Sequence, residues 1–126
     1  MDYKTYNSIA LAFLGDAVYE RFIRERILRH GSVGADRMHR EAVRYVKAAA
    51  QEQSLRALAD ELTEAEADVV RRARNHKITS KPKNADPVTY KMATAFEALL
   101  GYLYLDGQEE RLQTVMEQAA RVIEEA

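Results

Sequence analysis

The chain has 126 residues and a formal net charge of −1, and its 47% hydrophobic and 31% charged residues are typical of one soluble globular domain. The absence of cysteine excludes a disulfide framework, a thiolate zinc site and a cysteine nucleophile. No apolar run of about 18 residues is present and the N-terminal segment has no secretory pattern, so we expect a cytoplasmic location and no membrane partner.

Helical periodicity runs through the whole chain and predicts an all-α fold of about six or seven helices around one core. Asn7 or Ser8 is a suitable N-cap for a long first helix that ends near residues 30–31. A glycine-containing loop at 31–34 follows. The next apolar stripe runs from Met38 to Ala49, and another begins at Leu55 after a bend or short break.

The second half of the chain carries clearer helix boundaries. Thr63 and Glu66 have the spacing of a capping box and predict a helix that runs to about residue 75. Residues 76–86 are polar and basic, without periodicity, and predict a loop. Asp86 followed by Pro87 predicts the start of a buried helix that ends at residues 106–107. A final amphipathic helix is expected after it.

Charge is strongly segregated along the chain. Residues 60–68 hold five acids and no base, whereas residues 71–83 hold six bases and no acid. A second stretch, residues 21–47, has eight Lys or Arg against three acids. These blocks could be solvated helix surfaces balanced by nearby acids, or they could present a basic face to a polyanion such as nucleic acid.

Two carboxylates lie within strongly apolar helical segments. Asp16 is the one charged residue of 8–19, and Glu97 is the one charged residue of 92–105. An isolated buried carboxylate costs several kcal/mol unless it is hydrogen-bonded, paired with a cation or bound to a metal. Small residues that leave room for an ion, a water or a backbone lie beside both acids: Gly15, Ala93, Thr94 and Gly101.

Glu20 follows Asp16 by four residues, which places both acids on one helix face. A divalent cation between them would relieve their repulsion, and carboxylate oxygens favour Mg²⁺ or Mn²⁺ over Zn²⁺. A metal held in this way suits phosphoryl transfer. The alternative is structural, with Asp16 capping a helix and Glu97 pairing with an arginine.

Two motifs resemble the ribonuclease III family. The segment 11–18, LAFLGDAV, resembles its signature helix, and 93–106, ATAFEALLGYLYLD, resembles its second motif, with 44–47 between them where the family has its middle helix. Further segments resemble the Mini-ribonuclease III subfamily, which consists of a nuclease domain alone: 11–20, 39–46 and 82–86. The resemblance implies one nuclease domain over 1–126, without a double-stranded-RNA-binding domain.

The resemblance also implies an activity. It implies an all-α homodimer that cleaves both strands of double-stranded RNA, leaves 5′-phosphate and 3′-hydroxyl ends, and needs Mg²⁺, for which Mn²⁺ would substitute. The implied substrate is the precursor of the large-subunit (23S) ribosomal RNA, with a ribosomal protein on that substrate as a further partner. Asp16 and Glu97 match the family's catalytic, metal-binding acids, and Glu20 would add a contact.

The chain departs from the full-length enzymes of the family at two positions. Ala12 and Thr94 stand where those enzymes have a Glu and an Asp, so fewer protein ligands and more water are expected around the metal. These substitutions motivate a second hypothesis, a catalytically silent RNA- or ribosome-binding module with a nuclease-like fold. A third is a helical dimerisation domain with no role in nucleic-acid binding.

Without a separate RNA-binding domain, the nuclease domain would have to supply its own phosphate contacts. Two basic groups are candidates. The first lies near the expected site and the second comprises the end of the fourth predicted helix and the loop after it; together they contain Arg40, Arg44, Lys47, Arg71, Arg72, Arg74, Asn75, His76, Lys77, Lys81, Lys83 and Asn84.

Overall fold

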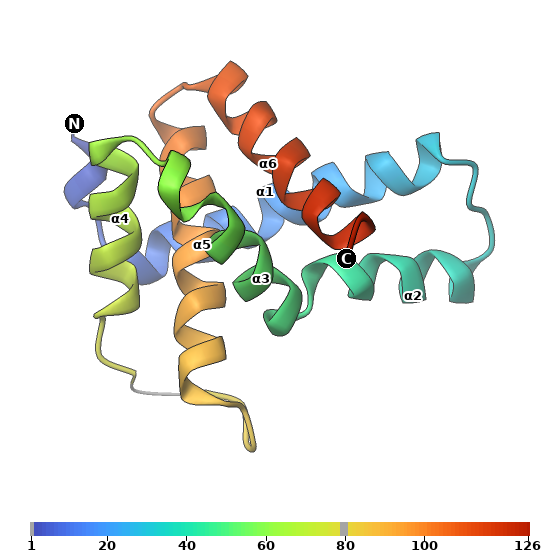
Figure 1. Cartoon of the computed structure of the whole chain (residues 1–126), viewed down its shortest axis with the longest axis horizontal. Helices are drawn as coiled ribbons and strands as arrows, with labels where there is room; N and C mark the ends of the chain where they lie inside the picture. Colours follow the sequence, from blue (N-terminus) through green and yellow to red (C-terminus); the bar gives the residue numbers. More distant parts are fainter. Residues whose placement is uncertain (1, 79–80) are drawn as a thin grey trace.

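The computed structural model describes residues 2–78 and 81–126 and is entirely helical over those residues (Figure 1). It confirms the predicted all-α fold of about six or seven helices. There are six α-helices and two short 3-10 helices: η1 (Tyr3–Thr5), α1 (Ser8–Arg29), α2 (Ala35–Val46), α3 (Ala48–Leu58), η2 (Ala59–Glu61), α4 (Glu64–Arg74), α5 (Pro87–Leu105) and α6 (Glu109–Glu124).

Side-chain caps begin three of these helices, as the sequence predicts. The Asn7 side chain accepts a hydrogen bond from the backbone N–H of Ala10 at 2.9 Å and starts α1. Thr63 and Glu66 form a complete capping box at the start of α4. Asp86 caps α5 with Pro87 in its first turn. These caps satisfy N–H groups that a helix leaves without partners.

The break between α2 and α3 lies earlier than the apolar pattern suggests. The backbone becomes extended at Lys47, with φ −62° and ψ 151°, so the expected stripe from Met38 to Ala49 is divided between two helices. The change of direction lets α2 pack mainly on α1, while α3 packs on α5 and α6. Periodicity does not detect this break because small apolar residues continue across it.

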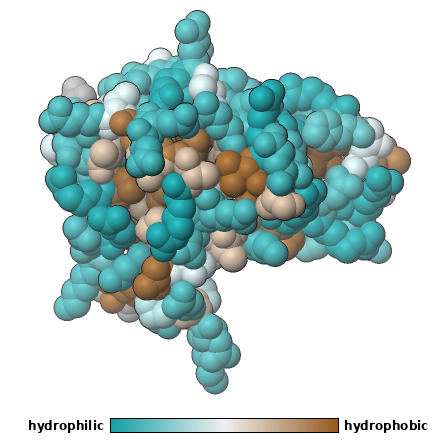
Figure 2. All heavy atoms as spheres, viewed as in Figure 1, coloured by the Kyte–Doolittle hydropathy of each residue, from teal (hydrophilic) through white to brown (hydrophobic). Residues whose placement is uncertain are grey.

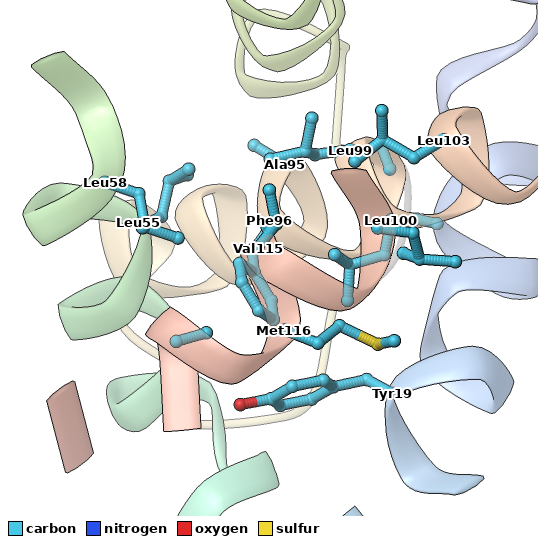
Figure 3. Packing of buried hydrophobic residues seen from close by; sticks show 14 of the residues in the cluster. Tyr19, Leu55, Leu58, Ala95, Phe96, Leu99, Leu100, Leu103, Val115 and Met116 are labelled. Carbon is cyan, nitrogen blue, oxygen red and sulfur yellow. The ribbon is translucent and has the colours of Figure 1, made fainter. Parts of the chain in front are cut away.

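Helix α5 is the centre of the core. Nearly every turn of it is buried, and α1, α3, α4 and α6 all pack against it (Figures 1 and 3). Figure 3 shows Tyr19 of α1 beside Phe96 of α5, where the two rings meet edge to face with centroids 5.0 Å apart. Aromatic pairs of this geometry add to the free energy gained by burying their apolar surface.

A buried ionic cluster ties α6 to α1 and α2. The guanidinium of Arg26 donates to the Glu124 carboxylate at 2.6 and 2.8 Å and to Glu117 at 2.8 Å. The Tyr45 hydroxyl donates to the same Glu124 at 2.7 Å. The arginine and the tyrosine hold the pKa of Glu124 well below its ordinary value, at about 2. Since removing one partner would leave a buried charge unpaired, the cluster fixes the C-terminal half of α6.

Helices α1 and α5 cross in direct backbone contact. A Cβ added at Gly15 would overlap with the backbone carbonyl of Glu97, and one added at Gly101 would overlap with the backbone carbonyl of Leu11. Each helix therefore needs a glycine opposite the backbone of the other. The same contact sets Asp16, the residue after Gly15, next to Glu97.

The face of the molecule shown in Figure 2 is mostly hydrophilic. On the face shown in Figure 2, hydrophobic side chains gather chiefly in the middle of the view, between hydrophilic helix surfaces. No helix among the described residues combines the length and the hydrophobicity needed to cross a membrane.

Gly101→Ala is expected to destabilise the fold strongly. Overpacking costs about 1–3 kcal/mol or more, and here the obstacle is a backbone carbonyl that cannot rotate away, so we expect a loss of at least about 3 kcal/mol. Urea unfolding followed by circular dichroism measures it. Gly107→Asn is the matched control, because Gly107 has φ +73° and open space around it, and Asn tolerates that conformation. If Gly101→Ala lowers the free energy of unfolding no more than Gly107→Asn does, the argument from backbone packing is contradicted.

Candidate active site and RNA-binding surface

Asp16 and Glu97 come together where α1 crosses α5. Asp16 follows the glycine that touches the Glu97 backbone, and its carboxylate lies close enough to Glu97 to raise the pKa of that acid. The expectation that both acids sit in the core is only partly met: Glu97 is half-buried, whereas Asp16 is exposed. The pair therefore opens to solvent on one side, which a site for a macromolecular substrate requires.

The electrostatics of Glu97 are strongly perturbed. Burial first, and then the neighbouring Asp16 carboxylate, raise its pKa from 4.5 to about 8. Both causes act against the charged form of Glu97. A half-buried acid whose ionisation is opposed by a nearby carboxylate is an arrangement that a bound cation relieves.

A third polar side chain, Gln51, completes this cluster. It lies in the first turn of α3, is 2% exposed, and donates from Nε2 to Glu97 Oε2 at 3.4 Å. Sequence reasoning did not single it out. A signal was present, because Gln51 occupies the buried stripe that continues through Leu55 and Leu58 at helical spacing.

The positions at which the family has further acids contribute no charge here. Ala12 is buried, and the Thr94 hydroxyl donates to the Tyr90 carbonyl of its own helix at 2.9 Å. Glu20 is paired with Arg24 at 3.2 Å. Over residues 2–78 and 81–126 no group of three or more His, Cys, Asp or Glu side chains gathers, so no cluster of three such ligands is present there. Contact between Glu20 and a metal thus stays a prediction.

The donor set of the site fits a hard divalent cation held by few protein ligands. Carboxylate oxygens are its only charged donors, which suits Mg²⁺ or Mn²⁺ and not zinc. Mg²⁺ keeps several of its waters and binds proteins through one or two carboxylates. Asp16 and Glu97 can supply such a pair.

The basic residues near this site differ in their structural roles. Arg44 donates to the Ile123 carbonyl at 3.2 Å, and its guanidinium lies 5.7 Å from the Tyr45 ring centre, so it helps to hold α6. Arg40 is exposed on α2. Lys47 is exposed at the break that leads into α3, four residues before Gln51.

The second basic group lies at the end of α4 and in the loop that leads to the N-terminal end of α5 (Figure 1). Arg72 donates to the carbonyls of Lys4 and Thr5 at 3.1 and 3.3 Å and thereby anchors η1. Arg71 pairs with Asp68 at 2.8 Å. Neither arginine is free for an incoming phosphate without giving up a protein contact.

Residues of the loop mostly shape the loop itself. The backbone N–H of Asn75 caps the end of α4, the His76 ring contacts the Lys77 carbonyl at 3.0 Å, and the Lys81 ammonium donates to the Ala85 carbonyl at 3.2 Å. Asn84 takes a left-handed conformation with φ 69°. Thr79 and Ser80, inside the predicted loop, lie outside the described residues.

Five cations of the predicted set are exposed and make no ion pair or hydrogen bond within the described part of the chain. They are Arg40, Lys47, Arg74, Lys77 and Lys83. Free positive charges can bind phosphates without breaking the fold. The structure thus narrows the list of RNA-binding candidates, and their role stays a prediction.

Comparisons with known proteins show which family the chain resembles. The model of the ribonuclease III domain matches residues 9–108, a range that includes Asp16, Gln51 and Glu97. The Mini-ribonuclease 3 of Symbiobacterium thermophilum is 54% identical over 95% of this chain and 92% of its own length. That of Thermoanaerobacter is 48% identical over 93% of this chain and 82% of its own length.

A crystal structure of a Fusobacterium nucleatum protein has the same fold. It superposes with a TM-score of 0.83 at 30% sequence identity, over 95% of this chain and 96% of that one. The chain therefore belongs to the ribonuclease III family, in its Mini-ribonuclease III branch, and is an endoribonuclease.

Proposed function

We propose that this chain is a Mg²⁺-dependent endoribonuclease that cleaves double-stranded RNA at a site built on Asp16 and Glu97. The observation that carries the proposal is the close approach of α1 and α5 at Gly15, which sets Asp16 beside the half-buried Glu97. Asp16 and Glu97 would hold the ion, with Mn²⁺ able to replace Mg²⁺. Glu97 must lose its proton before it can act as a ligand. When bound, such an ion polarises the scissile phosphate and activates water.

The proposed substrate is a duplex, and the exposed cations of the chain would contact its phosphates. Arg40, Lys47, Arg74, Lys77 and Lys83 supply charge for phosphate contacts, which suits an A-form helix recognised by its shape and backbone. Membership of the Mini-ribonuclease III branch suggests the 23S ribosomal RNA precursor as the substrate, with a ribosomal protein bound to it. The described helices pack around one core, which supports a single nuclease domain.

A second copy of the chain is the proposed partner of an apolar groove of about 710 Å³ on α1, α5 and α6. Leu14, Val18, Phe22, Tyr104, Leu112 and Met116 line it. Phe13 of α1, beside Leu14, is 83% exposed. An exposed aromatic ring and an apolar groove on the same helix can complement each other across a two-fold axis, where the same patch serves both copies.

Asp16→Asn and Glu97→Gln are each expected to lower cleavage of a long RNA duplex by at least about 1,000-fold while leaving the fold intact. Each substitution removes several kcal/mol of charge stabilisation from the transition state. The reaction rate falls tenfold for about every 1.4 kcal/mol lost. Gel assays with Mg²⁺, Mn²⁺ or EDTA measure it, with single-stranded RNA and duplex DNA as substrate controls.

Asp60→Asn is the matched control, since it neutralises an exposed carboxylate away from the crossing. Glu20→Gln in the same series reports whether that acid takes part. Full activity of folded Asp16→Asn, or duplex binding by the unmodified chain without any cleavage, would overturn the assignment.

Metal binding is expected to strengthen as the pH rises from 6 to 8 and to level off above it. The pKa of Glu97 is raised to about 8, so below that pH the ion must displace a proton, at a cost of about tenfold in affinity per pH unit. In the metal-free chain, Glu97 has the opposite effect, because its contribution to the stability of the fold decreases as the pH rises. A carboxyl group whose pKa is raised from 4.5 on folding stabilises the fold at low pH and loses that contribution as the pH rises through about 8.

The rise in Tm caused by Mg²⁺, measured between pH 6 and 9, tests this expectation. The rise in Tm should grow up to about pH 8 in the unmodified chain and then level off, and it should show no such growth in Glu97→Gln. A rise that is equal at all pH values would show that Glu97 does not couple proton release to metal binding.

Phe13→Ser is expected to convert a dimer into a monomer of 14.4 kDa in sedimentation velocity. The change removes the aromatic group that would enter the partner's groove. Val33→Ser is the matched control, because Val33 is 76% exposed in the α1–α2 loop, away from the groove. If the unmodified chain is itself monomeric at micromolar concentration, the homodimer proposal fails.

A further inference from the structure

Gln51 is a buried polar residue with its functional groups directed at the candidate site. Its side chain is 2% exposed, and its Nε2 makes two hydrogen bonds, to the Val46 carbonyl at 3.2 Å and to Glu97 Oε2 at 3.4 Å. The Val46 carbonyl precedes the helix break at Lys47, and the Ala50 N–H that would follow it in a continuous helix bonds to the Lys47 carbonyl instead. Gln51 therefore joins the helix break to the site.

The chemistry of these partners fixes the orientation of the amide. A carbonyl and a carboxylate are both acceptors, so the nitrogen of Gln51 must face them and the oxygen must point elsewhere. No donor within the described part of the chain meets Oε1. Over the same residues the one fully buried side-chain oxygen or nitrogen without a partner is the Tyr19 hydroxyl, so Gln51 Oε1 keeps contact with solvent.

We propose that Gln51 is a positioning residue of the metal site: Nε2 orients the Glu97 carboxylate, and Oε1 accepts a hydrogen bond from a water that the ion retains. The proposal rests on the proposed function, in which Asp16 and Glu97 hold the ion. It assigns to a neutral amide a role that the two acids cannot fill alone.

The composition of the site creates the need for such a group. Ala12 and Thr94 add no carboxylate, so an ion held by Asp16 and Glu97 retains most of its water. Retained waters are donors and need acceptors near the site. An amide oxygen provides one without adding a third negative charge beside a pair that already repels itself. Partners that orient a ligand in this way typically affect metal affinity by about 10- to 100-fold.

Gln51→Met is the direct test, because Met has similar length and flexibility but neither an amide donor nor an amide acceptor. We expect Mn²⁺ binding, followed by electron paramagnetic resonance of free Mn²⁺, to weaken by about 10- to 100-fold. The kcat for duplex RNA should fall with little change in KM, and added Mn²⁺ should restore part of it.

Ser54→Ala is the matched control. Ser54 lies one turn later on α3, is 1% exposed, and donates to the Ala119 carbonyl of α6 at 2.9 Å. Its loss also removes a buried hydrogen bond of α3, but one that does not touch Glu97. We expect a lower Tm and an unchanged Mn²⁺ affinity. A folded Gln51→Met chain with unchanged Mn²⁺ affinity would overturn the proposal.

Gln51→Glu separates the two functions of the amide, because it keeps an acceptor oxygen and loses the donor. At pH 8.5 it should bind Mn²⁺ more tightly than Gln51→Met, and equal affinities would refute the role of Oε1. Glu97→Gln in the same titration distinguishes the two proposals. If it leaves Mn²⁺ affinity unchanged, the proposed metal site is wrong; if it alone abolishes binding and Gln51→Met does not weaken it, only the role of Gln51 is wrong.

Discussion

The direct contact between the backbones of α1 and α5 is the constraint on which the rest of this structure depends. Gly15 and Gly101 lie opposite backbone carbonyls of the other helix, at a distance that no side chain could enter. Because the contact is made by backbone, it allows little adjustment by side-chain rotation. It places α5 at the centre of the core, where α3, α4 and α6 complete the packing around it (Figures 1 and 3).

The same contact creates the chemistry of the site. Asp16 and Glu97 are far apart in the chain and belong to apolar helices, yet the crossing sets their carboxyl groups together and leaves one side open to solvent. Burial and mutual repulsion raise the pKa of Glu97, so the folded chain holds a site that is unfavourable without a cation. Packing that stabilises the fold and electrostatics that favour an ion thus meet at the same few residues.

The cations of this chain are divided between structure and surface. Arg26, Arg72 and Arg111 hold carboxylates or carbonyls of neighbouring helices and secure the ends of α6, η1 and α4. Others, including Lys47 and Lys83, are exposed and have no partner within the described residues. A nearly neutral protein can present positive charge to RNA in this way when some of its acids, such as Glu124 and Glu66, are paired with structural arginines.

The amino-acid sequence is sufficient to predict the helical fold, most helix boundaries and the two acids proposed for the candidate site. Caps such as Thr63 with Glu66, and Asp86 with Pro87, act locally, so a short stretch of chain is enough to read them. Asp16 and Glu97 are visible as the one charge of an apolar segment each, 8–19 and 92–105, and through their motifs. Features that depend on contacts between distant segments of the chain could not be predicted from the sequence and are seen only in the tertiary structure.

Three features were seen only in the tertiary structure. They are the break at Lys47, the exposure of Asp16 and the structural hydrogen bonds of Arg44 and Arg72. The proposed role of Gln51 is a further such feature, because it depends on a 3.4 Å hydrogen bond to Glu97, which lies two α-helices further along the chain. Periodicity reports which face of a helix is buried. It does not report which side chain of another helix contacts that face, because this contact is fixed by how the helices pack.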